Sequence, residues 1–96
     1  MAEVQKTTES GEMTVRFIEF VRMHAQNASL CLGLMPHPQT GRPQVNLDVA
    51  RMLVEQLAAI AFKTRGNLTA NEATVLQNTL THLENSLAEA LKAERR

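Results

Sequence analysis

Hydrophobic residues recur along this chain at the three- and four-residue spacing of amphipathic α-helices, in three separate segments. The first segment, residues 13–32, carries one apolar stripe. The second segment, residues 47–65, has an apolar face about 160° wide at 3.6 residues per turn, so we expect it to touch more than one neighbour. The third segment, residues 70–92, has a narrow leucine seam with 3-4-3-4-3 spacing, which is typical of a helix packed against another helix.

A loop separates the first two segments. The stretch GLMPHPQTGRPQVN carries three prolines and two glycines, which excludes a helix or a central strand there. Gly33 stands where a left-handed residue would end the first helix, and Asn46 is a good N-cap for the second. We expect loop 34–45 to be ordered, because prolines reduce the entropy lost on ordering.

The stretch KTRGNLTANE joins the second and third helices. Lys63 and Arg65 fall in the last turn of the second helix, where cations complement the free carbonyls. Gly66 supplies a left-handed residue at the helix end. Thr69 is followed three residues later by Glu72, which is the pattern of a capping box. The stretch therefore predicts a tight corner between two helices.

These elements predict an all-α fold in one domain. The helical domain spans residues 12–94, and the polar residues 1–11 are expected to form a flexible tail. The short corner favours antiparallel packing of the second and third helices as a hairpin. The first helix is expected to pack across this hairpin through the long loop.

The composition narrows the classes of function. Ten basic and ten acidic residues balance, and Trp and Tyr are absent, which argues against a nucleic-acid partner. No apolar run approaches the ~18 residues that cross a bilayer, so no membrane partner is expected. The N-terminus does not resemble a signal peptide, and we expect a cytoplasmic protein.

The chain offers little catalytic chemistry. His24 and Cys31 share a helix face but lie about 10.5 Å apart along its axis. Two ligands of one zinc ion must lie within about 4 Å of each other, so this pair is not expected to chelate a metal. No nucleophile has a base and an orienting group at a recognisable spacing. We therefore expect no enzyme activity, no metal and no cofactor.

Several residues resemble the pattern of a known family. They are Phe17, Phe20, Leu32-Gly33, Pro38, Thr40-Gly41, Asn46-Leu47, Ala50 and, most specifically, KTRGNLTANE. In these positions, over roughly residues 17–83, the chain resembles the bacterial family called domain of unknown function 1844. The resemblance implies a small helical protein of bacteria, and it implies no activity or catalytic residue.

Two functions are open at this point. The first is a structural or interaction protein that works as a homo-oligomer, most simply a homodimer, because three small helices leave apolar side chains in water; the candidate residues are Phe17, Phe20, Phe62 and Met52. The alternative is an adaptor that binds a protein partner or an anionic ligand through loop 34–45 and corner 63–69. Its candidate contacts are Lys63, Arg65, Asn67, His37 and Arg42.

Overall fold

The computed structural model describes residues 2–94, with side chains from Gly11 onward. It contains three helices, α1 (Ala2–Cys31), α2 (Leu47–Lys63) and α3 (Ala70–Glu94), and residues 2–94 contain no strand. The predicted all-α, three-helix class is confirmed. The flexible tail expected over residues 1–11 lies, apart from Gly11, outside the residues whose side chains the structure describes.

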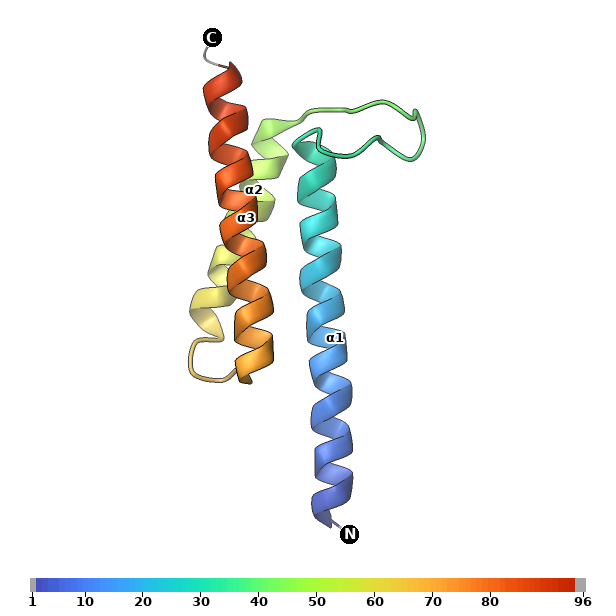
Figure 1. Ribbon diagram of the computed structural model, residues 1–96, viewed down its shortest axis with the longest axis vertical. Helices are drawn as coiled ribbons and strands as arrows, with labels where there is room; N and C mark the ends of the chain where they lie inside the picture. Colours follow the sequence, from blue (N-terminus) through green and yellow to red (C-terminus); the bar gives the residue numbers. More distant parts are fainter. Residues whose placement is uncertain (1, 95–96) are drawn as a thin grey trace.

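The three helices run side by side, and each packs against the other two. Figure 1 shows that α2 runs back along α1, and that α3 then returns beside α2 in the direction of α1. Helices α2 and α3 are therefore antiparallel neighbours joined by a short corner. Helix α1 lies lengthwise along this pair, and the long loop from α1 to α2 stands out from one end of the bundle.

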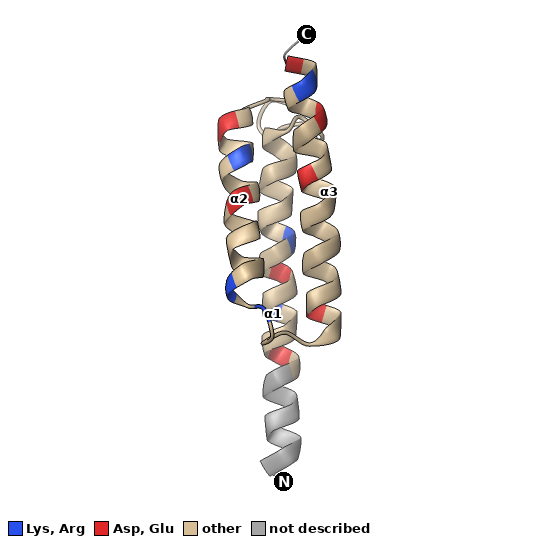
Figure 2. Cartoon of the chain, turned by 90° about the vertical axis from the view of Figure 1, so that its left-hand side faces the viewer, with Lys and Arg blue, Asp and Glu red and all other residues tan. Residues whose placement is uncertain are grey.

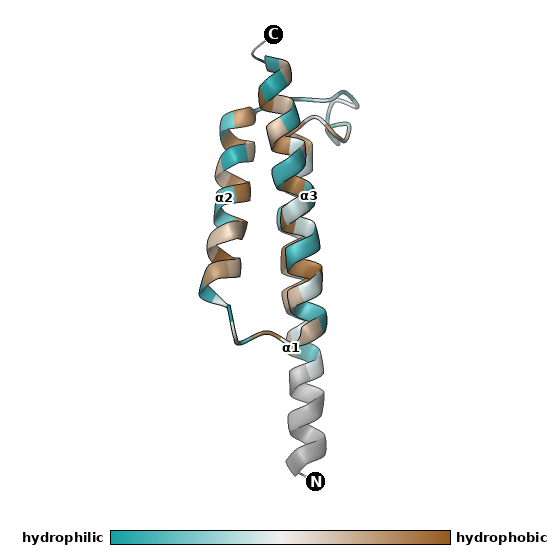
Figure 3. Cartoon of the chain, turned by 60° about the vertical axis from the view of Figure 1, so that its left-hand side comes forward, coloured by the Kyte–Doolittle hydropathy of each residue, from teal (hydrophilic) through white to brown (hydrophobic). Residues whose placement is uncertain are grey.

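The core is aliphatic and draws equally on the three helices. Hydrophobic and hydrophilic positions are interspersed along each helix (Figure 3), and apolar residues at helical spacing from all three helices pack together in the core. The buried apolar side chains of the described residues are Val21 and Ala28 of α1 with Leu32 directly after it, Ala50, Val54 and Leu57 of α2, and Leu76, Leu80 and Leu83 of α3. The leucine seam of α3 thus faces inward.

The end of α1 has the hydrogen bonds of a Schellman motif. The Gly33 amide donates to the Leu30 carbonyl at 3.1 Å, and the Leu34 amide donates to the Ser29 carbonyl at 3.0 Å. Gly33 has φ 77°, and a Cβ atom placed on it would lie 2.8 Å from the Val45 Cγ2 atom. Glycine is needed here both for the backbone conformation and for the close approach of the loop.

The start of α2 is fixed by Asn46. Its side-chain Oδ1 accepts a hydrogen bond from the Val49 amide at 3.2 Å, which is an N-cap contact. Its own amide donates to the Cys31 carbonyl at 2.8 Å. Asn46 therefore both begins α2 and ties that helix to the end of α1.

Candidate functional site

The corner between α2 and α3 is a hydrogen-bonded turn. Helix α2 ends at Lys63, and the Thr64 hydroxyl donates to the Ile60 carbonyl at 2.7 Å. The Asn67 amide donates to the Thr64 carbonyl at 2.9 Å, closing a β-turn in which Gly66 has φ 82°. Gly66 has the left-handed conformation that its residue type suggested. It lies in the turn after α2, and the C-cap residue of α2 is Thr64.

Side chains at the start of α3 accept hydrogen bonds from the backbone amides of the same turn. The Thr69 amide donates to Glu72 Oε1 at 2.8 Å, and the Glu72 amide donates to Thr69 Oγ1 at 3.1 Å, which together form a capping box. Glu72 is only 8% exposed. Its carboxylate occupies the position that an anion would take at this helix end, so the corner is poorly suited to bind one.

The Glu72 carboxylate also reaches α1. The Thr69 amide, and next the Thr14 hydroxyl, hydrogen-bond the charged form and hold the pKa of Glu72 below its ordinary value of 4.5. Thr14 lies inside α1, 58 positions away in sequence order. No sequence pattern linked these two residues.

The predicted cationic residues of the corner are exposed, and one of them has a partner. The Arg65 guanidinium lies 5.3 Å from the centre of the Phe62 ring, within the range of a cation–π contact. Lys63 and Asn67 are exposed beside it. The corner therefore offers two cations and an amide on an open surface.

Loop 34–45 contains an internally bonded turn. The His37 amide donates to the Arg42 carbonyl at 2.9 Å, and the Gly41 amide donates to the His37 carbonyl at 2.8 Å. Gly41 makes this turn possible with φ 70°. The Arg42 side chain is exposed, and His37 is half-buried.

The loop and the corner do not form one site. They lie at opposite ends of α2, whose 17 residues separate them by about 26 Å at 1.5 Å per residue. His37 and Arg42 therefore belong to one surface, and Lys63, Arg65 and Asn67 to another.

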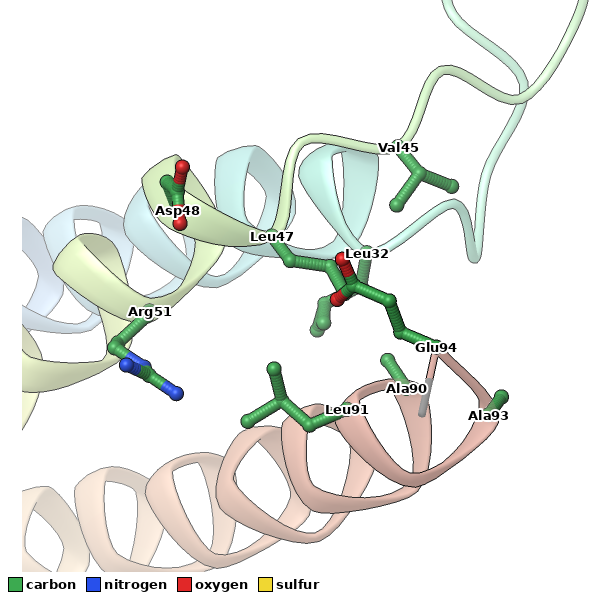
Figure 4. A pocket seen from close by; sticks show the side chains of 9 residues that line it. All are labelled: Leu32, Val45, Leu47, Asp48, Arg51, Ala90, Leu91, Ala93 and Glu94. Carbon is green, nitrogen blue, oxygen red and sulfur yellow. The ribbon is translucent and has the colours of Figure 1, made fainter. Parts of the chain in front are cut away.

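A cavity of about 620 Å³ opens at the loop end of the bundle (Figure 4). Its apolar lining comes from α2, α3, the loop residue Val45 and Leu32, which directly follows α1, and its charged residues are Arg51, Asp48 and Glu94. Figure 4 shows Arg51 and Asp48 on α2, and Glu94 at the end of α3. No Cys, Ser, Thr or His lines this cavity, and its carboxylates, Asp48 and Glu94, lie there with the cation Arg51.

The charged and metal-ligating side chains of the described residues point to no further site. Basic and acidic residues are interspersed along the described parts of α1 and α2, whereas most charged residues of α3 are acidic (Figure 2). Within residues 11–94, no three His, Cys, Asp or Glu side chains are grouped so that they could hold a metal ion. None of the described helices has a stretch long and apolar enough to cross a membrane.

The most distinctive surface feature is exposed apolar area. Among the residues predicted for self-association, Phe20 is 45% exposed, Met52 47% and Phe62 64%, while Phe17 is half-buried against the core. The structure adds exposed apolar side chains that the sequence reasoning did not select: Met13, Val15, Met23, Leu34 and Val45. Their helical spacing from Phe20 was the available signal for Met13 and Met23.

One histidine has a clear structural role. His24 Nε2 donates a hydrogen bond to the Leu53 carbonyl at 2.7 Å, which joins α1 to α2. The same ring packs beside Phe20, with ring centres 5.8 Å apart. His24 and Cys31 thus serve packing, and Cys31 is a free, half-buried thiol.

Residues 14–89 match the model of the family described as Domain of unknown function (DUF1844). The match covers most of the chain, including α2, α3 up to Glu89 and both connections. No curated protein and no solved structure is similar enough to count as a relative.

Proposed function

Because the chain belongs to the DUF1844 family, whose description names no activity, we propose a function from its own surface. The proposed role is that of a small, non-enzymatic interaction protein that works as a homodimer. The observation that carries this proposal is the exposure of Phe20, Met52 and Phe62 in a bundle of only three helices. The mixed signs of charge in Figure 2 favour a protein partner over nucleic acid or an anionic membrane.

Burial of the exposed apolar side chains would supply a free energy of the size needed to form a dimer. Burying a Phe or Met side chain fully is worth about 1.5–3 kcal/mol, and a half-exposed one recovers roughly half of that. A two-fold interface counts each contact twice, so three or four such residues per chain contribute roughly 5–10 kcal/mol. This gain is of the same size as the ~4–15 kcal/mol estimated cost of association, so these residues offset that cost and the other contacts of the interface set the affinity.

Sedimentation velocity of the full chain tests the proposal. Interference detection is needed, because a chain without Trp or Tyr absorbs poorly near 280 nm. A weight-average mass that rises from monomer toward dimer with concentration is the expected result. A monomer at every concentration up to about 100 μM, well above the micromolar affinity expected of a small interface, would contradict it.

A second candidate function is an adaptor that binds a partner through loop 34–45. The observation in its favour is that the loop stands out from the bundle (Figure 1) and yet is closed by the hydrogen bond between His37 and Arg42 and by that between Gly41 and His37. An ordered, exposed loop loses little entropy on binding. A strictly monomeric chain that captures one protein, and loses it on replacement of Arg42, would support this alternative.

A further inference from the structure

Helix α1 carries a second stripe of residues beside the one that faces the core. We call it the outer stripe; its members follow one another at 3-4-3-4-3 spacing and are Met13, Arg16, Phe20, Met23, Asn27 and Leu30. At 100° per residue they fall within an arc of about 100°. Met13 is 54% exposed, Phe20 45% and Met23 64%, so the apolar part of the stripe is in contact with solvent.

This spacing is that of a helix that packs against another helix. Alternating steps of three and four residues keep one seam facing a partner helix over several turns. The outer stripe runs from Met13 to Leu30, about 26 Å at 1.5 Å per residue. Neither α2 nor α3 covers it, since five of its six residues are exposed and only Leu30 is half-buried.

We propose that the outer stripe is the dimer interface, and that it packs against the same stripe of a second copy in antiparallel orientation. This inference rests on the proposed homodimer and narrows its surface to the stripe around Phe20, which does not include Met52 and Phe62. When a two-fold axis passes between positions 21 and 22, each apolar residue of the stripe faces an apolar residue of the second copy, and each polar residue faces a polar one. The pairs are Met13 with the partner's Leu30, Phe20 with the partner's Met23, and Arg16 with the partner's Asn27.

Other alignments of the two stripes match less well. A shift by one heptad in one direction sets Arg16 against the partner's Phe20. The opposite shift sets Met23 against the partner's Asn27. A parallel two-fold pairing sets Arg16 against its own copy, which places two like charges together. The antiparallel register is thus the one in which apolar residues meet apolar residues and the cation meets an amide.

A groove at the loop end of the stripe supports this register. It has a volume of about 780 Å³ and lies between α1, the loop and α2; Asn27 and Leu30 line it on one side, and Val49 and Leu53 on the other. In the antiparallel pairing the partner's Met13 arrives beside Leu30, at the mouth of this groove. Methionine is unbranched and flexible, and it fills irregular apolar gaps well.

The centre of the stripe is held in place before any partner binds. Phe20 packs beside the His24 ring, and His24 is fixed by its hydrogen bond to the Leu53 carbonyl. A large aromatic side chain that is already ordered loses little entropy on association. Phe20 is therefore expected to be the energetic centre of the interface.

The location of the interface is tested by polar substitutions at exposed positions of α1. Phe20→Ser and Met23→Ser lie on the outer stripe, whereas Val15→Ser removes an apolar side chain, 55% exposed, from another side of the same helix. In sedimentation of the full chain, each stripe variant should raise the dissociation constant of the dimer at least tenfold, because it removes a residue from the centre of the interface. Val15→Ser should raise it less than twofold. Far-UV circular dichroism verifies that each variant is folded.

The antiparallel register is tested by changing the charges at positions 16 and 27. Asn27→Lys places one lysine opposite Arg16 of the partner, so the dimer contains two like-charge pairs. Each exposed charge contact is worth roughly two- to fivefold in affinity, so the dissociation constant should rise about four- to twenty-fivefold. The double variant Arg16→Glu with Asn27→Lys creates two opposite-charge pairs in the antiparallel register and should restore or exceed the original affinity.

Each outcome decides a separate point. A chain that is monomeric throughout overturns the homodimer and this interface with it. A dimer whose dissociation constant is insensitive to Phe20→Ser, Met23→Ser and Asn27→Lys keeps the homodimer and overturns the outer stripe. A dimer weakened by Asn27→Lys but not restored by the double variant overturns the antiparallel register, because a parallel pair would face Glu with Glu and Lys with Lys.

Discussion

Replacing Gly33 by alanine should destabilise the protein more than replacing Gly66 by alanine, although both glycines have nearly the same backbone conformation. Their φ angles are 77° and 82°. An L-residue in this left-handed region costs about 1 kcal/mol. At Gly66 a new Cβ atom meets no atom within 4 Å, so the backbone cost is the whole cost there.

At Gly33 a second effect is added. The new Cβ atom would lie 2.8 Å from the Val45 Cγ2 atom, well inside the 3.4 Å at which ordinary van der Waals contact begins. Overpacking costs about 1–3 kcal/mol, and the lower value applies because Val45 is 62% exposed and can move. Gly33→Ala should therefore cost about 2 kcal/mol in free energy of unfolding, against about 1 kcal/mol for Gly66→Ala.

The assay is thermal unfolding followed by circular dichroism at one fixed protein concentration, because a dimer's melting temperature depends on concentration. In a domain of this size 1 kcal/mol corresponds to roughly 4–8 °C. Val45→Ala alone should change little, but in the Gly33→Ala background it should recover about 1 kcal/mol by removing the close contact. Equal losses at Gly33 and Gly66, or no recovery with Val45→Ala, would refute the steric part of this reasoning.

Three further predictions concern the corner and the loop. Because the pKa of Glu72 is lowered in the folded protein, its carboxylate should stabilise the fold above its ordinary pKa of 4.5 and lose this effect as the pH falls below that value; melting curves of wild type and Glu72→Gln should converge toward low pH, and a pH-independent difference would exclude the charge effect. Thr69→Ala should lower the free energy of unfolding by about 1 kcal/mol in urea titrations, whereas Thr69→Ser should retain most of it, and equal stability of the two would argue against the capping box. Native digestion with subtilisin, a protease of broad specificity, should leave loop 34–45 largely intact over times that cleave it in urea, since the turn is closed by hydrogen bonds, and rapid native cleavage within the loop would show an open loop.

The sequence alone determined the features that depend on neighbouring residues. Helical periodicity depends on positions three and four apart, so the three helices and their inward leucine, valine and alanine residues follow from local spacing. Capping chemistry is equally local: Thr69 and Glu72 are three residues apart, as are Asn46 and Val49, and these pairs bond in the structure as their residue types suggest.

Only the tertiary structure decided which distant residues meet and which helix faces stay uncovered. The contacts of Thr14 with Glu72, and of His24 with the Leu53 carbonyl, join residues far apart in the chain, and no short-range pattern encodes them. The separation of the loop from the corner follows from the straight course of α2 between them. The outer stripe of α1 was present in the sequence as a second seam, but periodicity cannot tell a covered seam from an open one, because burial depends on where the other helices pack.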